Sequence, residues 1–248
     1  MQPATAIDKA LGVLFHLHAQ PTPVGVSEIG RALSLPRSSA HRMLAALATH
    51  GLVEQDEDGR YRPGIALIAL GLGAQGRDPV VSAARPVLED EAREIGETMF
   101  LCALRAGRIV VLDEAEGTGF LRAAPRIGEA VPVHATAIGR LYLAFASDRV
   151  RLPAGALERF TPRTLVRPAA VRAAAEKARR QGWAENRGEW VPGLHVVAAP
   201  IFVGERLEAT LAVGAPAAHV TPEKAAYLAE RVVAGARRVS ERLEGRAG

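Results

Sequence analysis

Between Val26 and Gly51 the apolar residues recur at the spacing of two short helices. The two apolar faces comprise Val26, Ile29, Ala32 and Leu33, then Ala40, Leu44, Leu47 and Ala48. Pro36 lies between the faces, and because it lacks an amide hydrogen and has a fixed φ, it fits only the start of the second helix. The pattern predicts a helix, a tight turn and a second helix.

The polar positions in the first two turns of the second helix suit DNA. They are Arg37, Ser38, Ser39, His41 and Arg42. Arginine, serine and histidine at a helix N-terminus can bind phosphate oxygens and purine edges. No acidic residue occurs between Arg31 and Gly51. The pattern indicates a helix-turn-helix, and the alternative is an ordinary helical hairpin with a solvated polar face.

A short hairpin is expected directly after the second helix. Two strand-like runs, 52–55 and 60–62, flank the turn residues Asp56 to Gly59. A helix-turn-helix followed by a hairpin is a winged helix, and Arg60 and Arg62 would flank the duplex backbone. A preceding amphipathic helix, from about Thr5 to Gln20, is expected to bury Ile7, Leu11, Leu14, Phe15 and His18. These elements make a DNA-binding domain over residues 1–63.

Residues 64–78 are interpreted as a linker that begins with a short apolar helix. Its end, Gly71 to Gly76, fits the dinucleotide fingerprint G-x-G-x-x-G. That fingerprint requires a helix to open inside the motif, so that a pyrophosphate meets its N-terminus. Here Arg77-Asp78-Pro79 follows the motif directly, and a new helix is expected to begin at Pro79 instead. We therefore expect no dinucleotide site.

Residues 79–248 are expected to form an α+β domain with a mostly antiparallel sheet. Asp78 and Gly96 cap a helix that begins at Pro79, and Thr221-Pro222 begins the last helix. Other helices are expected at 135–146 and 167–181, and strands at 99–104, 109–115, 120–124, 196–202 and 207–213. Strand hairpins interleaved with helices are typical of a sheet with helices packed on it.

Charge and cysteine content narrow the classes of function. The net charge is +4, but residues 1–77 hold seven basic and six acidic residues, so charge position matters more than bulk charge. The single cysteine, Cys102, lies in an apolar run and excludes a disulfide or a thiolate cluster within one chain. The histidines lack metal-ligand spacing, and hydrolase and P-loop motifs are missing. We expect no enzyme activity, cofactor or metal.

The location follows from the N-terminal segment. The apolar run from Ala10 to Ala19 is too short to span a bilayer and no signal-peptide cleavage site follows it. We expect a cytoplasmic protein with no membrane partner.

The helix that opens near His134 is a candidate ligand site. Free amides at its N-terminus form an end that attracts anions, and His134 or Thr136 can add hydrogen-bond donors. This predicts that a carboxylate docks there. In the alternative, Thr136 caps its own helix and His134 makes a core hydrogen bond. Trp183 and Trp190 would wall such a pocket or serve as ordinary packing residues.

Several motifs in order resemble one family over nearly the whole chain. They are 7–11, 35–44 and 50–53 in the first part, and 131–140, 182–189, 191–194 and 198–201 in the second. Through them the chain resembles the IclR-type bacterial transcriptional regulators. The resemblance implies a homodimer or a dimer of dimers, and a GAF-like C-terminal domain that binds a small effector.

Carried over from this resemblance, the effector pocket would be lined by Ala123, Ala137, Ile138, Asn186, Val196, Ala212 and Gly214. The family often has lysine, aspartate and cysteine where this chain has Arg140, Asn186 and Val196. Members that bind small acids often have hydroxyl side chains at the positions of Ala212 and Gly214. The resulting lining is small and apolar, so an apolar or aromatic effector fits it better than a very small polar one.

Together these inferences predict a ligand-responsive regulator, a repressor or an activator. It would bind a palindromic double-stranded DNA operator as a dimer and sense a small aromatic or aliphatic acid. The alternatives are an enzyme or small-molecule-binding module with a fortuitous helix-turn-helix, and a protein-interaction module.

Overall fold

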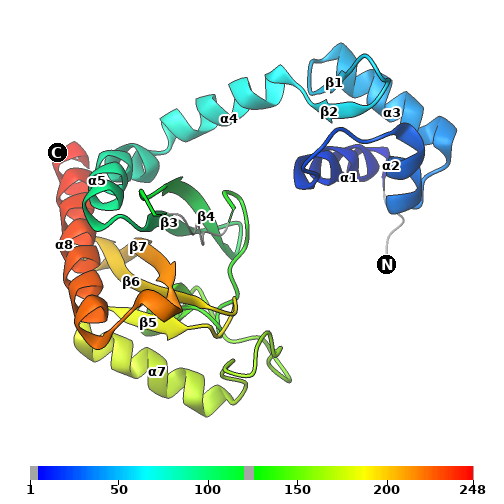
Figure 1. Cartoon of the computed structure of the whole chain (residues 1–248). Helices are drawn as coiled ribbons and strands as arrows, with labels where there is room; N and C mark the ends of the chain where they lie inside the picture. Colours follow the sequence, from blue (N-terminus) through cyan, green and yellow to red (C-terminus); the bar gives the residue numbers. More distant parts are fainter. Residues whose placement is uncertain (1–4, 120–125, 248) are drawn as a thin grey trace. The chain divides into compact units, whose positions relative to one another are not determined.

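The structure is a computed structural model that describes residues 5–119 and 126–247, and the chain divides into two units, Met1–Arg77 and Asp78–Gly248 (Figure 1). The first unit contains α1 (Ala6–Ala19), α2 (Val26–Ala32), α3 (Arg37–Thr49), β1 (Val53–Gln55), β2 (Tyr61–Pro63) and α4 (Ile65–Arg77). The second contains α5 (Pro79–Ile95), β3 (Thr98–Arg105), β4 (Arg108–Ala115), α6 (Ala137–Phe145), α7 (Pro168–Gln181), β5 (Ala184–Arg187), β6 (Leu194–Val203), β7 (Arg206–Pro216) and α8 (Pro222–Ala247).

The first unit is the predicted winged helix-turn-helix. Its three helices α1–α3 bury a core around Leu17, Ile29 and Leu44. The wing is an antiparallel hairpin of β1 and β2, and Tyr61 in β2 exchanges two backbone hydrogen bonds with Val24 (2.9 and 2.8 Å). These bonds join the wing to the segment that precedes α2, so the wing and the helices form one body.

The prediction of which side of α1 faces the core is wrong. α1 buries Val13 and Leu17, whereas Ile7, Leu11 and Phe15 are 71%, 46% and 72% exposed. Both sides of this helix carry large apolar residues, so its own periodicity does not show which side meets the core. The remaining two predicted residues are Leu14, which is half-buried, and His18, which is exposed, and the predicted buried residues Ala32 and Ala48 are also exposed.

The glycine motif at the end of the linker lies inside α4. That helix runs without interruption from Ile65 to Arg77, well past the predicted short segment. A continuous helix cannot form the strand-to-helix turn that holds a pyrophosphate. Along α4, Ile65, Ile68 and Leu72 share one side and are about three-fifths exposed.

The second unit is built on a five-stranded antiparallel sheet in the order β4-β3-β7-β6-β5. α5 and α8 cover one face of the sheet (Figure 1), and α6 and α7 pack on the other. The edge strand β5 was not predicted, because its sequence Ala-Glu-Asn-Arg has little apolar character. The predicted strand 120–124 lies outside the described residues.

No helix in the described part of the chain is both long enough and apolar enough to cross a membrane.

Candidate functional site

The first candidate surface is the start of α3. Pro36 occupies the N-cap, and Ala40, Leu44 and Leu47 bury one side of the helix. The predicted DNA-contacting residues therefore face outward: Arg37, Ser38, His41 and Arg42 are exposed and Ser39 is half-buried. None of these five side chains has a hydrogen bond or ion pair with another described residue. Their donors are available to an incoming ligand.

The two wing arginines are already engaged within the unit. Arg60 donates to the Pro23 carbonyl at 2.9 Å and pairs with Glu28 at 3.2 Å. Arg62 pairs with Glu54 at 3.2 Å, and its side chain is 58% exposed. An exposed pair of this kind contributes at most about 1 kcal/mol, so a phosphate could take over Arg62 at little cost. Arg60 joins the wing to the segment before α2 and to α2 itself.

Sequence reasoning missed a cleft at the turn between α2 and α3. Its lining comprises Ser27, Gly30, Arg31, Ser34, Leu35, Pro36 and Arg37. Arg31 and Arg37 give this open cleft a positive character beside the start of α3. The signal in the sequence was Arg31 itself, which begins the stretch without acidic residues.

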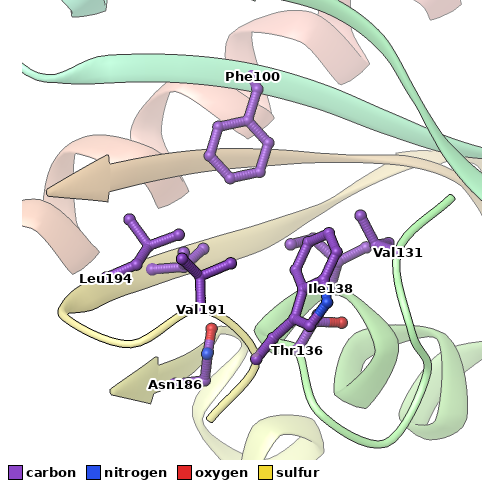
Figure 2. A pocket seen from close by; sticks show the side chains of 9 residues that line it. Phe100, Val131, Thr136, Ile138, Asn186, Val191 and Leu194 are labelled. Atoms are coloured by element: carbon purple, nitrogen blue, oxygen red, sulfur yellow. The ribbon is translucent and has the colours of Figure 1, made fainter. Parts of the chain in front are cut away.

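The second candidate site is a cavity between the sheet and α6 (Figure 2). Phe100 of β3 points into it from one strand. Thr136, the N-cap of α6, and Ile138 of α6 lie across from Leu194 (Figure 2). The full lining is Phe100, Val131, Thr136, Ile138, Asn186, Trp190, Val191, Leu194 and Val196. The cavity has a volume of about 10 Å³, which holds roughly one water molecule. The cavity is therefore closed to an organic ligand in this state.

The start of α6 is held by a short network. The Thr136 hydroxyl accepts from the Gly139 amide (3.0 Å) and donates to the Pro132 carbonyl (2.8 Å). A Cβ at position 139 would lie 2.0 Å from the Val133 carbonyl oxygen, so only glycine lets this segment fold against the helix. Thr136 caps its own helix, as the alternative interpretation held.

One corner of the cavity is polar. Asn186 is 4% exposed. Its side-chain amide makes only long hydrogen bonds, accepting from the Ala137 amide at 3.4 Å and donating to the Ala135 carbonyl at 3.5 Å. Within the described residues, the neighbouring amide of Ile138 has no hydrogen-bond partner. A side-chain amide and a helix N-terminus together suit a carboxylate, while the rest of the wall suits an apolar body.

The cavity contains four of the predicted effector residues: Thr136, Ile138, Asn186 and Val196. Ala137 and Ala212 belong to the adjoining core, and Gly214 pairs with Val196 across the sheet. Ala123 lies outside the described residues. His134 is not part of the lining, since its Nε2–H donates to the Glu158 carbonyl (2.8 Å) and its ring stacks on Phe160.

Sequence reasoning missed most of the apolar wall, namely Phe100, Val131, Val191 and Leu194. Phe100 was hidden because nearly all of β3 is buried on both faces, which erases the alternation that marks a half-buried strand. Of the two tryptophans, Trp190 lines the cavity and Trp183 packs against the core on the other side of the sheet.

A pair of buried charges lies next to the cavity. The Arg140 guanidinium on α6 donates to the Glu189 carboxylate and to the Glu185 carbonyl, and the Arg140 and Glu189 side chains are 8% and 14% exposed. Burial raises the pKa of Glu189, although the Arg140 charge acts in the opposite direction. On the neighbouring strand, the hydrogen bond from His195 holds the pKa of Glu185 below its ordinary value.

Comparison with known proteins agrees with this architecture. Residues 74–241 match the family described as "Bacterial transcriptional regulator IclR C-terminal", and residues 6–57 match the "IclR helix-turn-helix domain". The chain is 31% identical over 201 residues to the HTH-type transcriptional regulator XynR of Escherichia coli (strain K12), which covers 79% of this chain and 80% of that protein.

Two solved structures are similar along their whole length. The Thermotoga maritima IclR structure has a TM-score of 0.81 and 28% identity, covering 96% of this chain and 98% of that one. An IclR homolog from Microbacterium hydrocarbonoxydans complexed with 4-hydroxybenzoate has a TM-score of 0.82 and 25% identity, covering 98% and 100%. The relatives are named as transcriptional regulators, not as enzymes. The chain belongs to the IclR family of bacterial transcriptional regulators and is itself a DNA-binding regulator of transcription.

Proposed function

We propose that this regulator binds a palindromic operator as a dimer, with one α3 in each of two major grooves, and that a carboxylic acid with an apolar body controls it. The exposed, unpaired donors of Arg37, Ser38, His41 and Arg42 support the operator contact. Half-sites one helical turn apart, or a multiple of it, would match the two-fold symmetry of such a dimer.

The dimer is supported by two exposed apolar stripes in the first unit. One comprises Ile7, Leu11 and Phe15 on α1, and the other comprises Ile65, Ile68 and Leu72 on α4. In proteins that are surrounded by water, an exposed apolar surface of this kind marks an interaction site. A second copy of the chain presents the same stripes, so a symmetric pairing would bury both.

The effector class rests on the single polar corner of the cavity. Asn186 and the first amides of α6 would bind the carboxylate, and Phe100, Ile138 and Leu194 would enclose an aromatic or aliphatic body. The Microbacterium homolog, which binds 4-hydroxybenzoate, supports an aromatic acid as one candidate. An effector with unequal affinity for two arrangements of the dimer would shift the balance between them and thereby change operator binding.

The test measures fluorescence anisotropy of DNA from upstream of the protein's own gene, over a range of salt, with and without a panel of aromatic and aliphatic acids. We expect a specific affinity that falls with salt and that at least one acid changes. Asn186→Leu should keep the operator affinity and abolish the response to the acid. If Asn186→Leu responds like the wild type, Asn186 does not bind the effector.

A further inference from the structure

Among the described residues that line the cavity, only those of one segment are exposed to solvent. Seven of the nine lining residues are buried, whereas Trp190 is half-buried and Val191 is 41% exposed. Both lie on the loop Gly188–Gly193 between β5 and β6, and Figure 2 shows Val191 over the space between Asn186 and Leu194. Because the cavity holds about one water molecule, an effector can enter only after part of this wall moves.

We infer that the loop Gly188–Gly193 is the gate of the effector cavity, and that the Arg140–Glu189 ion pair is the latch that keeps it shut. This inference rests on the proposed effector site and names the residues that control access to it. Arg140 and Glu189 act as positioning residues in it, since neither lines the cavity.

The loop is anchored at its two ends, and Val191 near its middle is held from within the hairpin, through its carbonyl and the Leu194 amide at 3.2 Å. Gly188 donates to the Leu194 carbonyl and Gly193 accepts from the Ala217 amide, both at 2.7 Å. Both glycines have positive φ, 65° and 76°, a conformation open to glycine at little cost. In the described part of the chain, no hydrogen bond joins Trp190 or Val191 to an element outside this hairpin. The two cavity-lining residues can therefore swing while the ends of the loop stay in place.

Among the described residues, the latch is the only charged contact between this loop and α6, which begins at the cavity. Glu189 directly precedes Trp190 in the chain, and Arg140 lies one turn along α6 from Ala137. Thr161 and Thr164 add hydroxyl hydrogen bonds to the Gly188 and Glu189 carbonyls (2.8 and 2.6 Å). These bonds hold the backbone before the tip, so loss of the latch would free the tip without unfolding the loop.

The surroundings of the latch allow it to open. Buried charges attract each other strongly in a medium of low polarity, but a buried charge without a partner is costly. An open polar cleft adjoins the pair, lined in part by Lys177, Glu185 and Arg187 together with Arg140 and Glu189. Water in this cleft can hydrate both groups once they separate, so the pair has a closed state and a hydrated open state.

The experiment measures how fast a small thiol reagent reaches the cavity in the full-length chain. The parent carries Cys102→Ala, which removes the only native cysteine, and Val196→Cys, which places a thiol in the cavity wall. Methyl methanethiosulfonate is the probe, because it is small and uncharged. We expect Glu189→Gln, which keeps the side chain's size and removes its charge, to raise the labelling rate at least tenfold.

The matched control is Glu97→Gln. It breaks the Lys224–Glu97 pair, whose carboxylate is 11% exposed and neither of whose residues lines the cavity. Labelling should stay at the parent rate in this control, and the charge-swapped double variant Arg140→Glu/Glu189→Arg should restore slow labelling. Equal rates in the parent and Glu189→Gln would overturn the latch, as would an equal increase in Glu97→Gln, which would indicate general loosening.

A second readout needs no cysteine. In Trp183→Phe the remaining tryptophan is Trp190, on the gate itself, and acrylamide should quench its fluorescence more strongly after Glu189→Gln. Unchanged quenching would contradict the gate. Neither measurement uses DNA or an effector, so a gate that opens as expected in a protein that responds to no acid would disprove the proposed effector class and leave the gate standing.

Discussion

The two units hold their functional residues in opposite ways. The polar residues at the start of α3 are exposed and unpaired, and the core behind them is formed by other side chains. The cavity residues of the second unit are themselves core residues, and the space between them is nearly filled. The proposed DNA-binding surface is thus formed without changing the core, whereas the proposed effector site is part of the packing and would have to open before it could bind.

The largest expected effect comes from changing a cavity residue. Phe100→Ala should lower the free energy of unfolding of the second unit by about 3–5 kcal/mol, because Phe100 is 1% exposed and its removal leaves a larger void. Urea unfolding followed by tryptophan fluorescence reports this unit, which contains both tryptophans. Ser38→Ala on α3 is the matched control and should change stability by less than about 0.5 kcal/mol. Equal losses in the two variants would remove the contrast between the units.

A smaller effect is expected at the exposed apolar stripe of α4. Ile68→Glu should weaken the proposed dimer by about 1.5–3 kcal/mol per chain, since it replaces an apolar side chain that a partner would bury. Leu70→Glu is the control, because Leu70 is 63% exposed on the opposite side of the same helix. Sedimentation velocity over a range of protein concentrations gives both dissociation constants. A dimer equally weakened by both variants would place the interface elsewhere.

At the DNA-binding surface, Arg42→Ala should weaken specific operator binding by about 1–3 kcal/mol if Arg42 reads a guanine, with thermal stability unchanged. Arg237→Ala removes the same charge from an exposed site on α8, 81% exposed, and should leave the operator affinity at the wild-type value. Anisotropy titrations at fixed salt compare the two. An unchanged affinity in Arg42→Ala would exclude Arg42 as a base contact.

The smallest effect concerns pH and is confined to the second unit. The His195 hydrogen bond lowers the pKa of Glu185 in the folded chain below its ordinary value of 4.5. The charged form is therefore favoured by folding, so this contribution to stability is present above pH 4.5 and is lost as pH falls through the lowered pKa. Glu185→Gln should flatten the acid side of the stability curve in that window. Parallel curves for wild type and variant, measured by urea unfolding, would show that the bond adds nothing.

Prediction from the sequence succeeded where a local signal was sufficient. The spacing of Ala40, Leu44 and Leu47 indicates the buried side of α3, and hence which side its polar residues occupy. The caps Asp78 and Gly96 marked the ends of α5, and the polar and glycine residues 105–108 marked the β3–β4 turn. The same reasoning failed for α1, where apolar residues on both sides left the inward side undetermined.

The proposed effector site was only partly predictable, because its walls come from distant parts of the chain. The residues found through the resemblance, such as Ile138 and Asn186, lie in family motifs, whereas Phe100 lies in a strand with no alternation to reveal its direction. From the sequence alone, Trp183 and Trp190 were equally good candidates for the wall of the pocket. Which of them met the cavity depended on the β5–β6 pairing, and β5 itself gave no signal.

By itself the sequence determined the winged helix-turn-helix, the ends of the capped helices, the polar side of α3 and the family, since each depends on neighbouring residues or on ordered motifs. The tertiary structure decided which apolar residues of α1 and α4 stay exposed, how nearly the cavity is filled, and that Arg140 meets Glu189 across 49 positions of chain. Those features depend on which surfaces pack together. Packing is set by the folding of the whole chain and not by the period of any one segment.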